Sequence, residues 1–260
     1  MAVEDTLRSV GLDRYDLNAR LKPALLTLLP AILGVAFWIP QARTFTGATI
    51  TLLSSCGLLY LMSQTTRRLG RSVERLMGDK AGRKHSARLL THLDETIQAE
   101  TKARYHAYLR NHGLAISTPD EERSSPDTAF SRTSSAVDWL LEHTRPNAKT
   151  SLLFNENIAY GYQRNLYGLK FIALTIALTV SVGHGILLWT RPMDDTSLWI
   201  GLGLEAALIA MILLWLTTVT KASVTDASLA YAQQLFGHCE KTPSVTIKPR
   251  RDEAGPVDVA

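Results

Sequence analysis

Four long runs of hydrophobic residues are the strongest pattern in the chain. They cover residues 24–40, 45–63, 171–190 and 198–219, and they are nearly free of charged side chains. Each run has about 20 residues, the length that an α-helix needs to cross the hydrocarbon core of a bilayer. A soluble chain of 260 residues has too little other material to cover four such helices. The pattern predicts an all-α integral membrane protein with four transmembrane helices in two hairpins.

The distribution of Lys and Arg predicts how these hairpins are oriented. The short loops inside the hairpins carry one basic residue each, Arg43 and Arg191, whereas the segments outside them are rich in Arg and Lys. Because basic residues next to spans favour the cytoplasmic side, we expect both termini in the cytoplasm. The basic residues before the first run lack a cleavage site after them, which is typical of an uncleaved signal anchor. We expect the plasma membrane of a bacterium, its inner membrane, as the location.

This orientation divides the chain into five parts. They are an N-terminal cytoplasmic segment (1–23), a first hairpin (24–63), a cytoplasmic helical domain (64–168), a second hairpin (169–219) and a cytoplasmic helix with a disordered tail (220–260). Within the cytoplasmic domain, apolar spacing predicts helices that end near Met77, run over 86–111 and cover 136–143. Residues 117–135 are rich in Ser, Thr, Pro and acidic side chains, which predicts a flexible surface loop.

Four arginines follow the second run, where the chain leaves the bilayer. They are Arg67, Arg68, Arg71 and Arg75. One interpretation is contact with anionic lipid headgroups, which attract basic residues at the membrane surface. The other is orientation of the span alone, without any ligand. The sequence leaves both interpretations open.

The segment 152–170, which leads into the third run, has two contrasting faces as a helix. Tyr160, Arg164 and Tyr167 share one face, and Asn157, Gly161, Asn165 and Gly168 share the other. The small and amide face is suited to close packing against another helix. The aromatic and basic face suits the headgroup level of a membrane, which makes an interfacial helix the plain interpretation. A ligand pocket or gating elbow is the sharper hypothesis.

Together with residues 99–109, this segment resembles a pattern in uncharacterised bacterial membrane proteins, a family that implies no particular activity. The layout of four spans with a cytoplasmic insert is similar to that of small pore-forming effectors of bacterial anti-phage systems. That similarity lies in the arrangement and in no shared motif.

Two ionisable residues, His184 and Glu205, lie inside the predicted spans. In an antiparallel hairpin they sit at nearly equal depth, and an unpaired charge there is costly. We therefore expect the two side chains to pair within one protomer. The rival interpretation has Glu205 lining a pore between protomers.

Candidate chemistry elsewhere in the chain is sparse. The two cysteines, Cys56 and Cys239, are far apart and belong to no Cys/His cluster. The histidines show no metal-ligand spacing, and phosphate loops, nucleophile elbows and paired catalytic carboxylates are absent from the sequence. We expect no metal, no cofactor, no nucleic-acid partner and no catalytic residues.

Two classes of function fit these features. The first is an oligomeric pore-forming or membrane-perturbing protein that is controlled by its cytoplasmic helices. The second is a non-conducting membrane scaffold or sensor that recruits a cytoplasmic protein partner. Glycines in the spans favour close helix packing and a homo-oligomer, but they do so for both classes.

Overall fold

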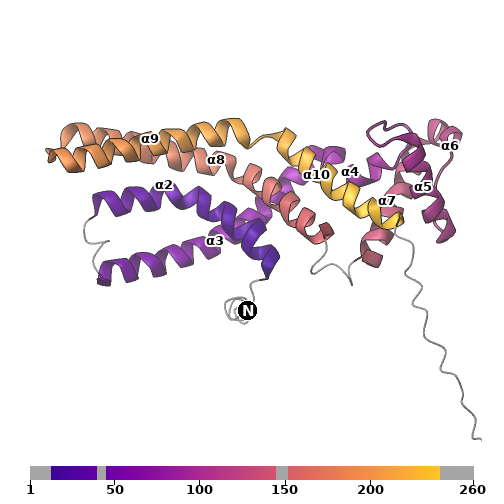
Figure 1. Cartoon of the computed structure of the whole chain (residues 1–260), viewed down its shortest axis with the longest axis horizontal. Helices are drawn as coiled ribbons and strands as arrows, with labels where there is room; N and C mark the ends of the chain where they lie inside the picture. Colours follow the sequence, from indigo (N-terminus) through magenta and orange to yellow (C-terminus); the bar gives the residue numbers. More distant parts are fainter. Residues whose placement is uncertain (1–12, 40–44, 145–151, 241–260) are drawn as a thin grey trace, which may run out of the picture.

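A computed structural model describes residues 13–39, 45–144 and 152–240, without the side chains of residues 45–56 and 59. This part of the chain is all-helical and contains no strand. Figure 1 shows an elongated molecule, with long helices side by side at one end and a cluster of shorter helices at the other. The predicted all-α fold class is confirmed.

The long helices form a bundle at one end of the molecule (Figure 1). Its elements are η1 (Asp16–Leu21), α2 (Lys22–Trp38), α3 (Phe45–Met77), α8 (Leu152–Thr190) and α9 (Asp195–Thr218). The helices Asp16–Trp38, Leu152–Thr190 and Asp195–Thr218 are long and apolar enough to cross a membrane. The predicted second span coincides with the first part of α3, where most side chains lie outside the described residues.

Large apolar side chains cover the outside of the bundle. Phe171, Trp189 and Trp199 are 87%, 91% and 72% exposed, and many aliphatic side chains on α8 and α9 are exposed with them. So much uncovered apolar surface is unfavourable in water and is compatible with a location in a membrane.

The shorter helices form a helical domain around a separate hydrophobic core. Its elements are η3 (Gly78–Lys80), α4 (Gly82–Leu89), α5 (Ala99–Asn111), α6 (Pro119–Ser124), α7 (Pro126–Thr144), α10 (Lys221–Phe236) and η5 (Gly237–Cys239). Leu89, Leu109, Leu140 and Phe236 are among the fully buried side chains of this core. Because α10 follows α9 and packs here, the C-terminal part of the described chain returns from the bundle to this domain.

The expectation of a flexible loop over 117–135 is wrong, because α6 and most of α7 lie there. Thr118 caps α6 in a reciprocal capping box with Glu121, and Pro119 occupies the first turn, where its missing N–H costs nothing. The helix α7 then buries Ala129 and Thr133 on the side that faces the core. The polar composition belongs to the outer surface of packed helices.

The helix expected over 86–111 is also interrupted, because α4 ends at Leu89 and α5 begins at Ala99. Leu93 lies in this break and is 63% exposed. The predicted break before α4 is confirmed, since Gly78 and Gly82 have φ values of 59° and 62°. Such left-handed backbone is accessible to glycine at little cost.

Candidate functional site

The strongest candidate for a functional site is the junction where the helix bundle meets the helical domain. The helix α8 has 39 residues and reaches from the domain into the bundle without interruption, a length of about 58 Å. It packs against α2, α3, α9 and α10. The segment 152–170 forms the part of α8 that lies at this junction.

Asn165 sits at the centre of the junction and is fully buried. Its Nδ2 donates a hydrogen bond to the backbone carbonyl of Ala19 at 2.7 Å. Ala19 lies in the π-helical turn η1, and Pro23, which follows this turn, has no N–H to donate. The side chain of Asn165 thus supplies a donor to a carbonyl in this irregular stretch of backbone.

Glycines allow three helices to approach one another around Asn165. A Cβ on Gly161 would stand 2.5 Å from the Tyr15 hydroxyl oxygen, and one on Gly168 would stand 3.0 Å from the backbone carbon of Leu69. A Cβ on Gly70 of α3 would lie 1.9 Å from Oδ1 of Asn165. The small and amide face of the 152–170 segment thus packs closely at Gly161, Asn165 and Gly168.

The opposite face of this segment is held by an ion pair with α3. Arg164 Nη1 lies 2.6 Å from Glu74 Oε2, and the Arg164 side chain is only 13% exposed. The Arg164 guanidinium also lies over the ring of Tyr160, at 5.5 Å from its centroid. Tyr160 is 5% exposed, and its ring stacks on that of Tyr231 from α10 at 6.2 Å. These contacts connect α8 to both α3 and α10.

An interfacial helix would expose this face to lipid headgroups, but at Tyr160 and Arg164 the face packs against protein. Tyr160 is buried, and Arg164 is largely buried against protein atoms, because Glu74 offers the guanidinium a partner inside the fold. Asn157 also differs from the expectation, since it lines the same pocket as Tyr160 and Arg164. Tyr167 packs, half-buried, between the clusters around Trp215 and Val224.

A pocket of about 260 Å³ lies between this face and the helical domain. Glu74, Arg83, Asn157, Tyr160 and Arg164 supply its polar walls, and residues of α7, α8 and α10 supply apolar ones. Among the described residues, the Tyr160 hydroxyl and Arg164 Nε are buried without a hydrogen-bond partner.

The four arginines after the second predicted span are all exposed, but they do not act together. Arg68, Arg71 and Arg75 line a groove of about 760 Å³ beside α4. Arg67 does not line this groove. Sequence reasoning missed Arg83 and Lys84, which line the groove from α4.

The direct pairing of His184 with Glu205 is wrong. Trp38 Nε1 donates to His184 Nδ1 at 2.7 Å, and His184 Nε2 lies 2.9 Å from the carbonyl oxygen of Gly201. Since an indole N–H can only donate and a carbonyl can only accept, His184 is the neutral tautomer with its proton on Nε2. Both ring nitrogens of His184 therefore have partners other than Glu205. One of these partners, Trp38, belongs to α2 and so lies outside the hairpin that contains His184.

Glu205 bonds instead to Ser181, whose Oγ donates to Glu205 Oε1 at 2.5 Å. The second carboxylate oxygen, Oε2, is buried and has no hydrogen-bond partner among the described residues. The neighbouring residues on the same face of α9, Leu202 and Ile209, are 44% and 47% exposed. A polar group with an unmet hydrogen-bonding capacity thus lies beside an uncovered apolar face.

Lys170 is a further residue of the junction, which the sequence analysis did not single out. Its Nζ donates to the carbonyl oxygens of Leu216 and Val219 at 3.1 and 2.7 Å. These carbonyls belong to the end of α9, where orphan acceptors and the helix dipole favour a cation. The signal available in the sequence was the position of a lysine at the same predicted depth as the end of the last span.

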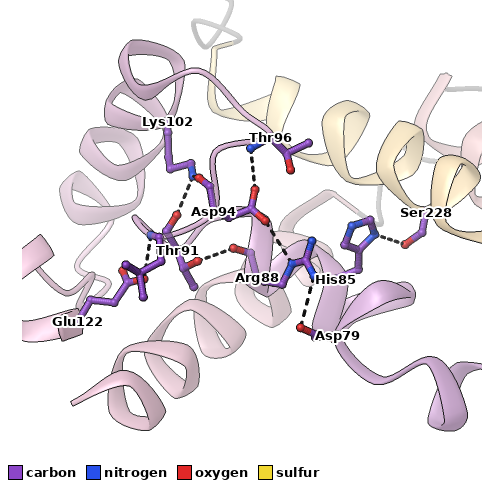
Figure 2. A network of polar contacts seen from close by, with 10 residues as sticks. Asp79, His85, Arg88, Thr91, Asp94, Thr96, Lys102, Glu122 and Ser228 are labelled. Carbon is purple, nitrogen blue, oxygen red and sulfur yellow. Dashed lines mark hydrogen bonds and ion pairs between the residues drawn. The ribbon is translucent and has the colours of Figure 1, made fainter. Parts of the chain in front are cut away.

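A second polar cluster fills the break between α4 and α5 (Figure 2). Lys102 is 4% exposed and donates to the carbonyl oxygens of Thr91, at 2.7 Å, and of Asp94. Burial lowers the pKa of Lys102, against the pull of Asp94. Glu122 from α6 accepts from the backbone N–H groups of His92 and Leu93 at 2.8 and 3.1 Å. This cluster forms hydrogen bonds with backbone groups of the break, so it stabilises the connection between α4 and α5.

The histidines of the helical domain take part in similar support. His106 lies 2.7 Å from the carbonyl oxygen of Leu90, and burial lowers its pKa to about 4 despite that hydrogen bond. Burial and the nearby Arg88 lower the pKa of His85, which bonds to Ser228 at 3.0 Å. The described ranges contain no group of three or more His, Cys, Asp or Glu residues that could hold a metal ion.

Comparison of the chain with protein-family models, with curated proteins and with solved structures gave no match. The function is therefore argued from the geometry of the junction and of the helix bundle.

Proposed function

We propose that this protein is a multi-pass membrane protein that forms an oligomeric pore, or perturbs the membrane as an oligomer, under the control of its helical domain. In this proposal α2, the first part of α3, the second part of α8 and α9 are the four spans. The helical domain and both termini face the cytoplasm, as the distribution of Lys and Arg favours, and the membrane is the bacterial inner membrane.

The observation that carries the proposal is the state of Glu205. Its Oε2 has no partner among the described residues although it lies in a strongly apolar helix. An ionisable group in a span normally faces a partner or a water-filled space, because leaving it unsatisfied is costly. A second copy of the chain, or water between two copies, would supply the hydrogen-bond donor that Glu205 Oε2 lacks within one protomer. The exposed Leu202 and Ile209 beside it offer a surface for such a copy.

Control by the helical domain is supported by the continuity of α8. This helix carries Arg164 and Tyr160, held in the junction, and also Ser181, bonded to Glu205. Because a helix transmits displacement along its axis, a rearrangement of the domain would reach the Glu205 region directly. The junction is in this sense the candidate for the gating elbow.

The proposal is tested by flux through liposomes that contain the purified protein. Glu205→Gln keeps the volume of the side chain and an acceptor for Ser181, so we expect intact folding and an ion or dye flux reduced on the order of tenfold. Asp195→Asn is the matched control, because it removes a carboxylate from the exposed start of the same helix, and we expect no change.

Two results would contradict the pore. One is a wild-type protein that oligomerises but releases neither ions nor dye. The other is an equal flux for Glu205→Gln and Asp195→Asn. The first result would favour the scaffold or sensor, for which recovery of a cytoplasmic protein together with the wild-type chain would be the evidence. The second result would remove Glu205 from the pore and with it the observation that carries the proposal.

A further inference from the structure

The pocket at the junction and the arginine groove beside α4 are neighbours that share two walls. Glu74 and Arg83 line both the pocket of about 260 Å³ and the groove of about 760 Å³. A ligand in the groove can therefore extend past these two side chains toward Tyr160 and Arg164. Together the two hollows fall within the size range of small-molecule sites.

The groove supplies positive charge that the fold leaves uncompensated. Its basic lining consists of Arg68, Arg71, Arg75, Arg83 and Lys84. Within the described part of the chain, only Arg83 of these five forms an ion pair, with the exposed Asp138 at 3.0 Å. The single carboxylate of the groove, Glu74, is already neutralised by Arg164. Guanidinium groups gathered in this way favour a phosphate, which can accept from several of them at once.

The pocket supplies a donor that the fold leaves unused. The Tyr160 hydroxyl is buried, with no hydrogen-bond partner among the described residues, and Tyr160 as a whole is 5% exposed. Buried polar groups are nearly always hydrogen-bonded, so this hydroxyl in the wall of the pocket points to an occupant that accepts from it.

Gly82 keeps this space open between α3, α4 and α8. A Cβ there would stand 2.1 Å from Glu74 Oε1 and 2.9 Å from the Tyr160 hydroxyl oxygen. The glycine therefore lets a carboxylate acceptor and a phenol donor lie close to each other beside the pocket. This combination suits hydroxyl groups, which both donate and accept hydrogen bonds.

We propose that the groove and the pocket form one binding site for a phosphate group carried on a small hydroxyl-bearing molecule. The phosphate lies among Arg68, Arg71, Arg75, Arg83 and Lys84, and the hydroxyl-bearing part enters the pocket between Glu74, Tyr160 and Arg164. The same chemistry occurs in a free phosphate ester and in the headgroup of an anionic phospholipid. The proposal does not depend on whether the spans form a pore.

The experiment measures binding to the full-length protein in detergent by calorimetry, with three probes. They are sn-glycerol 3-phosphate as a free phosphate ester, dihexanoyl phosphatidylglycerol as a phospholipid with the same kind of headgroup, and dihexanoyl phosphatidylcholine as a phospholipid without net charge. Binding of glycerol 3-phosphate supports the site with a free ligand. Binding of phosphatidylglycerol alone supports the site with a lipid headgroup.

Two pairs of variants locate the binding. Tyr160→Phe removes a hydroxyl that has no hydrogen-bond partner among the described residues, so we expect the fold to stay intact and the affinity to fall by about tenfold. Tyr108→Phe, in the helical domain but away from the pocket, is its control. Arg71→Gln should weaken binding by about tenfold or more. Arg67→Gln, one turn away on the same helix and outside the groove, should change it by less than about twofold.

Three results would overturn the proposal. The first is binding of none of the probes, or equal binding of phosphatidylcholine. The second is binding that neither Tyr160→Phe nor Arg71→Gln weakens, which would place it elsewhere on the protein. The third is binding that Arg71→Gln weakens and Tyr160→Phe leaves unchanged, because the groove would then act without the pocket.

Discussion

At the scale of single residues, Asn165 shows how one side chain can connect three helices. It belongs to α8, its Nδ2 bonds to the carbonyl of Ala19 in η1, and its Oδ1 occupies the space that Gly70 leaves in α3. An apolar side chain of the same size would leave the Ala19 carbonyl without a donor, at a cost of about 1–3 kcal/mol. The polar centre of the junction is therefore specific in its geometry.

The fit between Gly70 and Asn165 leads to a prediction. Glycine to alanine inside a helix normally stabilises by up to about 1 kcal/mol. At Gly70 we expect the opposite sign, a loss of roughly 1–3 kcal/mol, because the new methyl group displaces Asn165. The measurement is thermal unfolding in detergent.

Two further variants isolate this cause. Gly57→Ala on the same helix meets no atom within 4 Å, so it should be neutral or stabilising. In an Asn165→Ala background, Gly70→Ala should cost much less than it does in the wild type, because the clashing oxygen is gone. Equal losses for Gly57→Ala and Gly70→Ala would refute the close fit.

At the scale of elements, the break between α4 and α5 is stabilised by side chains from other parts of the domain. Lys102 donates to its carbonyls, and Glu122 accepts from its amides (Figure 2). His106 fixes the end of α4 through the carbonyl of Leu90. A connection that lacks regular helical hydrogen bonds thus obtains several backbone hydrogen bonds from buried ionisable groups.

The burial of His106 predicts a dependence of stability on pH. Its pKa is about 4 in the folded protein against 6.5 in an unfolded chain, so the unfolded chain binds more protons between these values. Stability from this site is fully present above pH 6.5 and is lost as the pH falls toward 4, with a loss of about 3 kcal/mol. Urea unfolding of the full chain in detergent at several pH values measures it.

His106→Gln provides the control, because its amide nitrogen reaches the position of Nε2 and can still donate to Leu90 but does not titrate. The difference in unfolding free energy between wild type and variant should shrink as the pH falls from 6.5 to 4. A difference that stays constant over this range would mean that His106 is not buried in its neutral form.

The sequence predicted elements well where a local signal decided them. Gly78 and Gly82 ended a helix as expected, and the apolar runs marked three helices long enough to cross a membrane. It failed at α6 and α7, because polar composition resembles a loop until the burial of Ala129 and Thr133 is known. The partner of His184 was missed for a similar reason, since depth within one hairpin says nothing of Trp38 arriving from another helix.

At the scale of the whole molecule, the helix bundle and the helical domain form two ends of one elongated body (Figure 1). The helices α3 and α8 run through both ends, and α10 returns from the last helix of the bundle into the core of the domain. The fold therefore places every covalent connection between bundle and domain at the same level, where Lys170, Arg164 and Asn165 make their contacts.

This arrangement predicts a pattern of accessibility if the bundle spans a membrane as proposed. In a variant without Cys56 and Cys239, a cysteine at Asp195 should react with an impermeant thiol reagent in intact cells. A cysteine at Ser125, in the exposed link between α6 and α7, should react only after lysis. Labelling of the Ser125 position in intact cells would exclude the proposed orientation.

Because α8 is continuous, the directions in which side chains point at its two ends are fixed relative to each other. Arg164 and Asn165 must meet their partners at the junction while Ser181 and His184 meet theirs farther along the same helix. Inserting one residue between these groups would turn everything beyond it by about 100° and move it 1.5 Å along the axis. The junction contacts and the contacts around Glu205 could then no longer be satisfied together. The spacing of 16 residues between Asn165 and Ser181 is thus fixed by geometry, whatever side chains lie in between.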